Sequence, residues 1–445
     1  MHEIHIKKLG PLDECRLKIQ QFNVFTGPQS NGKSTIAKAI YYCRSIKQDI
    51  LTVMMQGGPA KILPNHATWK SIMQLRMKEK FLQIFGTSWI MPIDMAVDYI
   101  YGNENMQLHI SLSEVPNHDG RNFININFSD GFIELFEDLD MYSFTSITPN
   151  QRDTWERKLS KSLADPYDTF FIPAGRNLIT LLSEQLNYIF TSLEGSQLRQ
   201  IDYITKRFIE TILRLKPSFS DGIDGYIANI AAHSDIDAFK KYKNNKPVIN
   251  LLLPRVQEIL GGQYCYVDGE ERLYITPQKY IKINFASSGQ QEIIWVFNLL
   301  FYFLIEDKKV FLILEEPESH LYPESQRAIG EILGLFLNNG KNAELITTHS
   351  PYLLGTFNYM LQAGQCSEFS AQEIKHKLRK RYWLDPSAVS ASYIINGHIE
   401  DAIDNSDNFT LIKNELIDQA SVDINEISDY ILEQNFEVTG DDEHQ

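Results

Sequence analysis

The sequence reads Gly27-Pro28-Gln29-Ser30-Asn31-Gly32-Lys33-Ser34-Thr35 close to its beginning. This is the pattern G-x-x-x-x-G-K-[ST], a loop whose glycines let the backbone curl until its N–H groups point at a phosphate. Lys33 supplies a mobile positive charge for the outer phosphates, and Ser34 offers a hydroxyl to Mg²⁺. We therefore predict a site for ATP and Mg²⁺ built from Gly27, Asn31, Gly32, Lys33, Ser34 and Thr35.

The flanks of this loop fit an anion site. Residues 22–26 are typical of a buried strand, and residues 36–42 have the pattern of a helix. A strand, a glycine loop and a helix N-terminus together present N–H groups and a positive dipole end to an anion. The sequence therefore predicts an α/β fold around a nucleotide.

The composition is that of a globular chain, with 445 residues of which 43% are hydrophobic. Its four cysteines form no C-x-x-C pair, which favours reduced thiols and no structural zinc. No run of about 18 apolar residues occurs, and the N-terminus lacks the anatomy of a signal peptide. We expect a cytoplasmic protein without a membrane span or membrane partner.

The net charge of −15 comes mostly from residues 400–445, which hold fourteen acidic residues and one lysine. The rest of the chain is close to neutral, so overall acidity does not exclude contact with nucleic acid. Apolar residues recur through this tail, which suggests short amphipathic helices that dock on another chain or, equally, a solvated helical terminus. These residues are Ile403, Leu411, Ile412, Leu416, Ile417, Ile424, Ile427, Ile431 and Leu432.

A second cluster of motifs lies far downstream. Residues 310–314 are apolar and lead into Glu315 and Glu316, followed by Pro317-Glu318-Ser319-His320-Leu321. We expect a buried strand that delivers two acids to the edge of a sheet. Glu315 is predicted to hold Mg²⁺, and Glu316 to polarise the attacking water. A strand ending at a solvated acidic turn is the alternative, which the phosphate loop disfavours.

Two further motifs complete the set. Residues 343–347 form another short apolar run, and His349 follows it at a position that can contact the γ-phosphate. A small-residue segment precedes an apolar helix at 293–305 and forms a second anion site. Because one chain cannot easily bring both anion sites to one nucleotide, we predict that this segment closes on ATP held by a second subunit. It comprises Ser287, Ser288, Gly289 and Gln290.

In this order the four motifs resemble the ATP-binding-cassette-type ATPases of the SMC and RecF class, in particular the AAA branch typified by the ATPase half of OLD nucleases. Residues 4–12 resemble the first strand and turn of that class. Residues 170–176 resemble an internal motif, which implies that Arg176 lies near the nucleotide and binds ATP. Glu315 stands where transporter ATPases usually have Asp, and Ser288 replaces a glycine, so a transport role is disfavoured.

The resemblance implies an α/β head with a mixed sheet, formed by residues 1–45 and 270–360, and a C-terminal region at 361–445 with helices and the acidic tail. Residues 46–269 form a large α+β insertion, strand-rich first and helical later. We predict a helix at 71–85, strands at 107–112 and 123–128, a turn at 129–131 into a strand at 132–135, helical structure over 177–215, and a hairpin of 264–267 with 273–275. No heptad pattern persists, so the insertion is not a coiled coil.

After His349 the sequence has no convincing Toprim or His-Asn-His nuclease set. The chain is therefore similar to stand-alone ATPase subunits of anti-phage systems such as PARIS and Septu. The resemblance implies a homo-oligomer with ATP-sandwich dimers, a separately encoded Toprim-like or HNH nuclease partner, and a phage trigger.

Two other functions stay open. A RecF-type repair or replication ATPase would bind nucleic acid, for which the basic run at 375–381, followed by Tyr382 and Trp383, is a candidate. That run is otherwise a solvated helix face or a contact for an acidic surface. A non-hydrolysing scaffold is the third, against which Glu315 and Glu316 argue.

Overall fold

The structure is a computed structural model of the chain. It describes residues 1–62, 68–114, 122–142, 144, 147–181, 202–232, 236–339, 342–366, 368–405, 409–414 and 426–429. Within these ranges no helix has both the length and the apolar character needed to cross a membrane.

The central element is a six-stranded sheet in the order β14-β13-β3-β12-β11-β7. Its strands run parallel except for β14, which pairs antiparallel with β13 at one edge. The strand before the phosphate loop, β3, lies between two strands from the distant C-terminal half. The bounds are β3 Phe22–Thr26, β7 Asp168–Ile172, β11 Val310–Glu315, β12 Ala343–Thr347, β13 Val389–Ile395 and β14 His398–Asp401.

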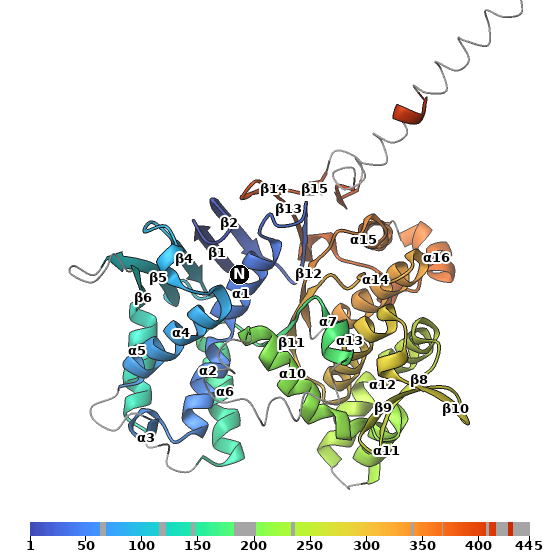
Figure 1. The fold of residues 1–445 in the computed structure, drawn as a ribbon, viewed down its shortest axis with the longest axis horizontal. Coiled ribbons are helices and arrows are strands. Elements are labelled where there is room, and N and C mark those ends of the chain that lie inside the picture. The colour runs from blue at the N-terminus through green and yellow to red at the C-terminus, as the bar shows by residue number, and fades with distance from the viewer. Residues whose placement is uncertain are drawn as a thin grey trace, which may run out of the picture.

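A second sheet, of five antiparallel strands in the order β2-β1-β4-β5-β6, forms the lobe on the left of Figure 1. A three-stranded sheet, β10-β9-β8, lies in the other lobe, and β15 pairs with β16 near the C-terminus. The bounds are β1 His2–Lys7, β2 Glu14–Ile19, β4 Ala96–Ile100, β5 Gln107–Glu114, β6 Asn122–Phe128, β8 Gln263–Val267, β9 Glu270–Thr276, β10 Lys279–Lys282, β15 Ile403–Asp404 and β16 Leu411–Ile412.

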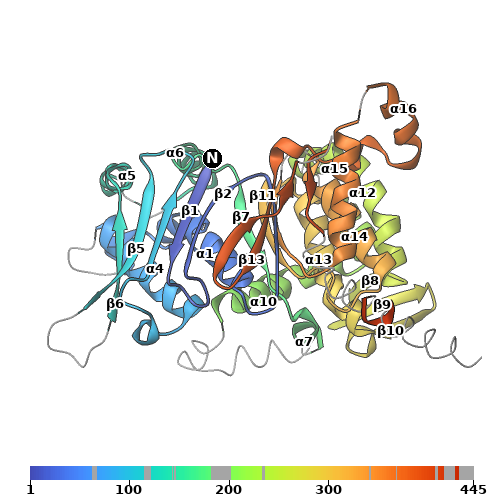
Figure 2. The same ribbon diagram turned by 90° about the horizontal axis from the view of Figure 1, so that it is seen from above.

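Helices cover both faces of the central sheet, as the view in Figure 2 makes clear. On the side of the first lobe lie α1 Lys33–Arg44, α2 Ile46–Met55, α3 Pro59–Ile62, α4 Trp69–Phe85, α5 Asp130–Asp140 and α6 Pro149–Ser162. The remaining helices are α7 Arg176–Leu181, α10 Tyr203–Leu215, α11 Gly222–Ala232, α12 Ile236–Leu260, α13 Ser288–Ile305, α14 Pro323–Leu337, α15 Pro351–Gly364 and α16 Glu368–Lys377. Short 3-10 turns are η1 Ser88–Ile90, η2 Lys216–Phe219, η3 Ile283–Phe285, η4 Lys380–Tyr382 and η5 Pro386–Ala388.

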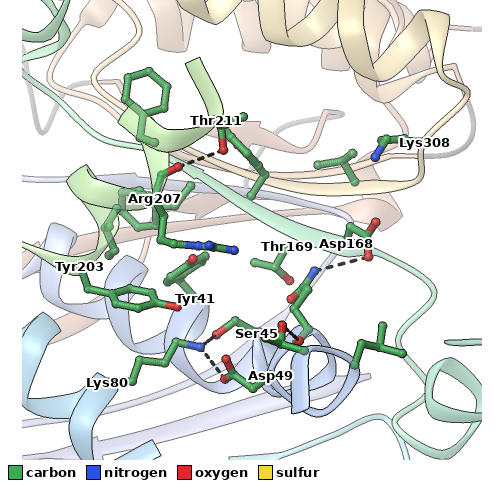
Figure 3. Close-up of a pocket in the computed structure, with 18 of the residues that line it drawn as sticks. Tyr41, Ser45, Asp49, Lys80, Asp168, Thr169, Tyr203, Arg207, Thr211 and Lys308 are labelled. Atoms are coloured by element: carbon green, nitrogen blue, oxygen red, sulfur yellow. Dashed lines mark hydrogen bonds and ion pairs between the residues drawn. The ribbon is translucent and has the colours of Figure 1, made fainter. Parts of the chain in front are cut away.

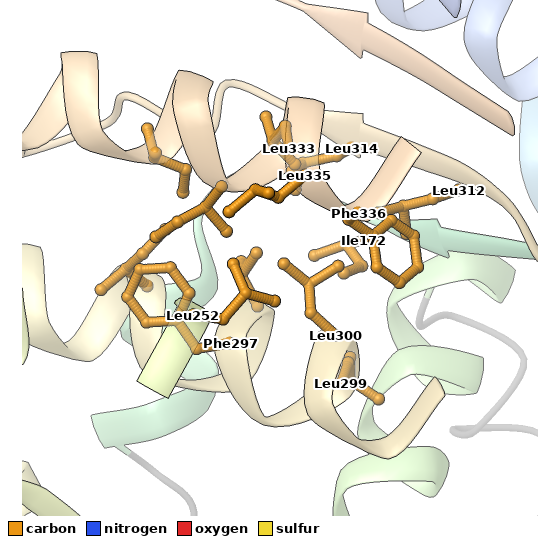
Figure 4. Packing of buried hydrophobic residues seen from close by; sticks show 14 of the residues in the cluster. Ile172, Leu252, Phe297, Leu299, Leu300, Leu312, Leu314, Leu333, Leu335 and Phe336 are labelled. Atoms are coloured by element: carbon orange, nitrogen blue, oxygen red, sulfur yellow. The ribbon is translucent and has the colours of Figure 1, made fainter. Parts of the chain in front are cut away.

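Strand β11 explains why the sheet is covered on both sides. Its residues are buried from end to end, and successive side chains point to opposite faces. Phe311 and Ile313 join the apolar cluster that includes α1 and the first lobe. Leu312 and Leu314 join the cluster with α13 and α14, which Figure 4 shows at close range. A continuous apolar run of this kind is typical of a parallel strand with helices on both faces.

Most of the predicted elements are present. The α/β class with a mixed central sheet is confirmed, as are the helix at 71–85, which lies in α4, and the strands in β5 and β6. The hairpin of β8 and β9 is also confirmed. Helices α7 and α10 confirm helical structure at both ends of 177–215, while residues 182–201 lie outside the described residues.

Two predictions are wrong. Residues 132–135 are not a strand, because they begin α5, where Phe132, Leu135, Phe136 and Leu139 are buried along one helix face. That spacing of three and four residues is helical, and a four-residue window hides it. In the tail, the apolar residues at 403, 411 and 412 lie in β15 and β16 and not in amphipathic helices. Ile427 is exposed within the helical residues 426–429, as expected for the alternative of a solvated helical terminus, and residues 416, 417, 424, 431 and 432 lie outside the described residues.

The central sheet also uses more of the chain than the core expected from sequence. Strand β7 comes from the segment expected as an insertion, and β13 and β14 come from the C-terminal region. Strand β13 pairs directly with β3, so residues 389–395 lie beside the phosphate loop.

Candidate functional site

The phosphate loop leaves β3 and ends at the first turn of α1. Gly27 has a φ of 132°, and a Cβ atom there would lie 2.2 Å from the carbonyl oxygen of Ile394. Gly32 has a φ of 106° at the start of α1, where a Cβ atom would lie 2.5 Å from Cδ2 of Leu12. Both positions demand glycine, because a side chain would be strained and would clash. The motif's glycines are therefore required by the fold of the loop itself.

Lys33 lies inside this loop. Its Nζ donates to the carbonyl oxygens of Gly27 and Pro28 at 2.8 and 2.7 Å. Burial lowers the pKa of Lys33 to about 8, against the opposing effect of Glu316 and Glu318. Phosphate oxygens are stronger acceptors than neutral carbonyls, so an incoming phosphate can draw this ammonium group from them.

The other loop residues differ in what they offer. Ser34 is exposed in the first turn of α1, and Thr35 is half-buried beside Gly10. Asn31 instead ties the loop together: its Nδ2 donates to the Gln29 carbonyl at 2.9 Å, and its Oδ1 accepts the N–H of Asn396 at 2.7 Å. In this structure the Asn31 side chain therefore connects the loop to the turn after β13, and its predicted ATP contact stays a prediction.

Two acids end β11 at the same edge of the sheet. Glu315 is 5% exposed, and its Oε2 accepts the N–H of Ala174 at 3.2 Å. Its Oε1 is buried without a hydrogen-bond partner among the described residues. Glu316 has a φ of 42°, held by its N–H donating to the Thr347 carbonyl at 2.9 Å. A left-handed glutamate is strained backbone, which concentrates at functional sites.

His349 lies beside the second acid. Its Nε2 is 3.7 Å from Oε1 of Glu316, and the pKa of His349 is lowered by burial and by the charge of Lys33. The imidazole is therefore neutral near pH 7.

Glu318 fixes the position of His349 and was given no role from sequence. Its Oε1 accepts the hydroxyl of Thr348 and the backbone N–H of His349, each at 2.7 Å. Burial raises the pKa of Glu318. The sequence signal for this role was the position of Glu318 in the same motif, two residues after Glu316.

Arg176 does not lie free for the nucleotide. It is 0% exposed, and its guanidinium donates to the carbonyl oxygens of Pro173, Glu315, Glu316 and Glu292 at 2.6 to 3.0 Å. Its backbone N–H donates to Oε2 of Glu292 at 3.1 Å. In this structure the side chain clamps the end of β11 to helix α13, and the ATP contact of Arg176 stays a prediction.

The small-residue segment caps α13. Oγ of Ser287 accepts the N–H of Gln290 at 3.3 Å, and Oε1 of Gln290 accepts the N–H of Ser287 at 2.9 Å, which is a capping box. Nε2 of Gln290 donates to the Leu260 carbonyl at 2.7 Å, so this predicted ATP ligand is used within the chain. Gly289 is packed so closely that a Cβ atom would lie 2.6 Å from the His320 carbonyl. Ser287 and Ser288 are exposed.

A glycine loop that holds a lysine, two carboxylates at the end of the parallel strand β11 and a histidine after the strand between them, β12, define a P-loop nucleotide-binding fold. The family model of the AAA ATPase domain matches residues 1–354. The chain therefore belongs to the AAA ATPase domain family, and it is an ATPase of this type. Comparison with curated proteins gave no match.

Three solved structures illustrate the weaker likenesses. An SMC head bound to the C-winged helix domain of ScpA is 14% identical, with 89% of this chain and 95% of that chain covered and a TM-score of 0.37. The SMC head domain from Thermotoga maritima is 11% identical, covering 90% and 97%, with a TM-score of 0.33. An ATP-binding cassette in a dimeric post-hydrolysis state with ADP and Pi is 11% identical, covering 89% and 96%, with a TM-score of 0.28. Likenesses of this size carry no argument about this chain.

Proposed function

We propose that this chain binds and hydrolyses ATP in sites completed by a second copy, and that the ATP state controls a separate effector protein. The observation that carries the catalytic part is the meeting of Lys33, Glu316 and His349 at one edge of the central sheet. Lys33 holds the outer phosphates, Glu316 polarises the attacking water, and neutral His349 contacts the γ-phosphate.

The residues present fit Mg²⁺. Oε1 of Glu315 is a buried carboxylate oxygen without a partner among the described residues, and a buried charge of this kind is costly unless a cation or donor meets it. Carboxylate and hydroxyl oxygens are the ligands that Mg²⁺ prefers, so Glu315 and Ser34 are the proposed ligands. When bound, Mg²⁺ neutralises charge that develops on the transferred phosphate.

Exposed apolar side chains support assembly on the face that carries the α13 cap. Phe285 is 79% exposed directly before this cap, and Tyr322 is 73% exposed directly after the loop against which Gly289 packs. Tyr352 is 54% exposed three residues after His349. Large apolar side chains exposed near the cap and near His349 would be buried if another chain covered this part of the surface. We propose that this face buries itself against a second copy, that Ser287 and Ser288 reach the partner's ATP, and that the dimers build a higher homo-oligomer.

The test of the catalytic assignment is Glu316→Gln. This change keeps the size of the side chain and removes its negative charge, so ATP should bind with near-normal affinity while turnover falls about 100-fold or more. Equilibrium binding of ATP and phosphate release report the two steps separately. Unchanged hydrolysis would contradict the role of Glu316.

For the effector we propose a separately encoded nuclease, Toprim-like or HNH, released in response to a phage trigger protein. The support is the sequence resemblance together with an apolar patch on the first lobe, where Trp89, Ile90 and Ile93 are 58%, 85% and 46% exposed. Co-expression with neighbouring open reading frames, followed by purification of wild type and Ile90→Asp, tests this. A nuclease that co-purifies with wild type and not with the variant supports the proposal. Failure of both chains to retain a nuclease contradicts it.

A second candidate function is nucleic-acid binding by a RecF-like or SMC-like ATPase. Helix α16 and η4 expose Lys375, Lys377, Arg379, Lys380 and Arg381, while Tyr382 is buried. DNA binding through this ridge would weaken steeply with salt, because each neutralised phosphate releases a counterion. Binding of duplex DNA that a double Lys375→Glu, Lys377→Glu variant loses would favour this function over effector control.

A further inference from the structure

A cavity of about 490 Å³ opens between the two lobes, at the opposite end of α1 from the phosphate loop. Its walls come from α1 and α2 on one side and from α10 on the other, and the first residues of β7 lie between them (Figure 3). Strand β7 is the edge strand of the central sheet. Cavities of this size hold single small ligands. This cavity lies where β7 begins, whereas the ATP site lies at the opposite edge of the sheet, where β3 and β11 end.

The charge of the walls is strongly biased. Six basic side chains line the cavity against three acidic ones, namely Arg76, Lys80, Arg152, Arg207, Arg214 and Lys308 against Asp49, Glu156 and Asp168. Lys80 is paired with Asp49 at 2.6 Å, and Arg207 contacts Glu210 at 3.2 Å outside the cavity wall. Figure 3 shows Arg207 extending from α10 toward the middle of the cavity, between Tyr203 and Thr169. A cluster of this sign favours an anion.

The same walls are rich in rings. Seven aromatic residues line the cavity: Tyr41, Phe170, Phe171, Tyr203, Phe208, Tyr302 and Phe303. Cations already lie over two of these rings, with Nζ of Lys80 5.4 Å from the Tyr203 ring and Nζ of Lys308 5.1 Å from the Tyr302 ring. Aromatic faces next to cations suit a planar ring that carries an anionic group.

Two residues that line the cavity each have a side-chain oxygen without a hydrogen-bond partner among the described residues. Oγ1 of Thr169, a residue 8% exposed, and Oε1 of Gln48 are buried with no hydrogen-bond partner among the described residues. Buried polar groups of this kind are rare, because they lose hydration without a replacement. Thr169 and Gln48 thus supply a polar part of a wall that is otherwise largely basic and aromatic.

We propose that this cavity is a second ligand site, separate from the ATP site, and that it takes a nucleoside monophosphate. The phosphate lies against Arg207 and Lys308, and the base lies among the tyrosines with its polar edge toward Thr169 and Gln48. The phosphate loop grips the outer phosphates of a nucleotide, so a monophosphate distinguishes the two sites.

The test is calorimetric titration of the full chain with AMP, GMP, CMP and UMP, each in wild type and in Lys33→Ala. At least one should bind at one molecule per chain in both proteins. Arg207→Glu should weaken binding about ten-fold or more, because a charge-assisted contact is lost, and Arg207→Lys should keep most of it. Arg327→Glu, the same charge change at an exposed position of α14, is the matched control and should change nothing.

Adenosine and ribose 5-phosphate serve as partial probes. Each should bind more weakly than AMP if base and phosphate both contribute. The proposal is overturned if no monophosphate binds, if Arg207→Glu and Arg327→Glu behave alike, or if Lys33→Ala abolishes binding, which would place the monophosphate in the ATP site.

Discussion

Replacement of Glu344 by Gln is expected to stabilise the chain, and by more as the pH rises. Glu344 lies in the central strand β12 at 0% exposure, and neither of its carboxylate oxygens has a hydrogen-bond partner among the described residues. Burial alone raises its pKa well above the ordinary value. Folding therefore favours the protonated form of this side chain relative to the unfolded chain.

The size of the effect follows from proton linkage. An unfolded glutamate has a pKa of about 4.3, and each unit by which folding raises this pKa costs about 1.36 kcal/mol once the pH exceeds the folded-state value. Because the unfolded state binds fewer protons than the folded state above this pKa, stability falls as the pH rises, until the folded-state pKa is reached. Glu344→Gln does not titrate, so its advantage should grow with pH by at most about 1.4 kcal/mol per pH unit.

Urea unfolding followed by tryptophan fluorescence at about pH 6, 7 and 8 measures this difference in the free energy of unfolding. Glu373→Gln, on the exposed side of α16, removes the same charge from the surface and should leave the stability almost unchanged at every pH. A gain from Glu344→Gln that does not change with pH, or a loss of stability at the highest pH, would refute the reasoning. Either result would mean that Glu344 is ionised in the folded chain.

The lowered pKa of Lys33, about 8, predicts that ATP binding near pH 8 takes up part of a proton, because phosphates stabilise the charged amine. Calorimetry in two buffers of different ionisation enthalpy measures this uptake, and equal heats in both would contradict it. Arg176→Lys should destabilise the chain by about 1–3 kcal/mol or more, because the shorter side chain leaves buried carbonyl acceptors at the contact between β11 and α13 unpaired. Urea unfolding checks this value, and a change below about 1 kcal/mol would show that the clamp is dispensable.

The features that could be predicted from the sequence belong to short local motifs. Gly27, Gly32, Lys33, Glu315 and Glu316 sit in patterns whose chemistry requires these residue types at this spacing, and each lies where its motif predicts, at the end of a buried strand or the start of a helix. Each of these patterns is defined by a few neighbouring residues, so it can be recognised without knowing the rest of the fold.

The features that could not be predicted from the sequence depend on contacts between residues that are far apart along the chain. Strand β13 pairs with β3, which lies more than three hundred residues earlier in the sequence. No local periodicity predicts this pairing. Arg176 was assigned to the nucleotide because its segment resembles a motif, whereas its acceptors are carbonyls supplied by Glu315, Glu316 and Glu292. Glutamate is usually found on the surface. Only the sheet order shows that Glu344 is buried, in a strand that lies between two others.

We propose that each ATP site uses the phosphate loop of one chain and the α13 cap of another. This can be tested by mixing two inactive variants: Lys33→Ala, which damages the loop, and Ser288→Glu, which puts a repelling charge on the exposed cap. If the sites are shared, a random mixture of dimers should recover about one quarter of the wild-type ATPase rate, because each mixed dimer holds one intact site. If each chain completes its own site, the mixture should stay as inactive as its two components.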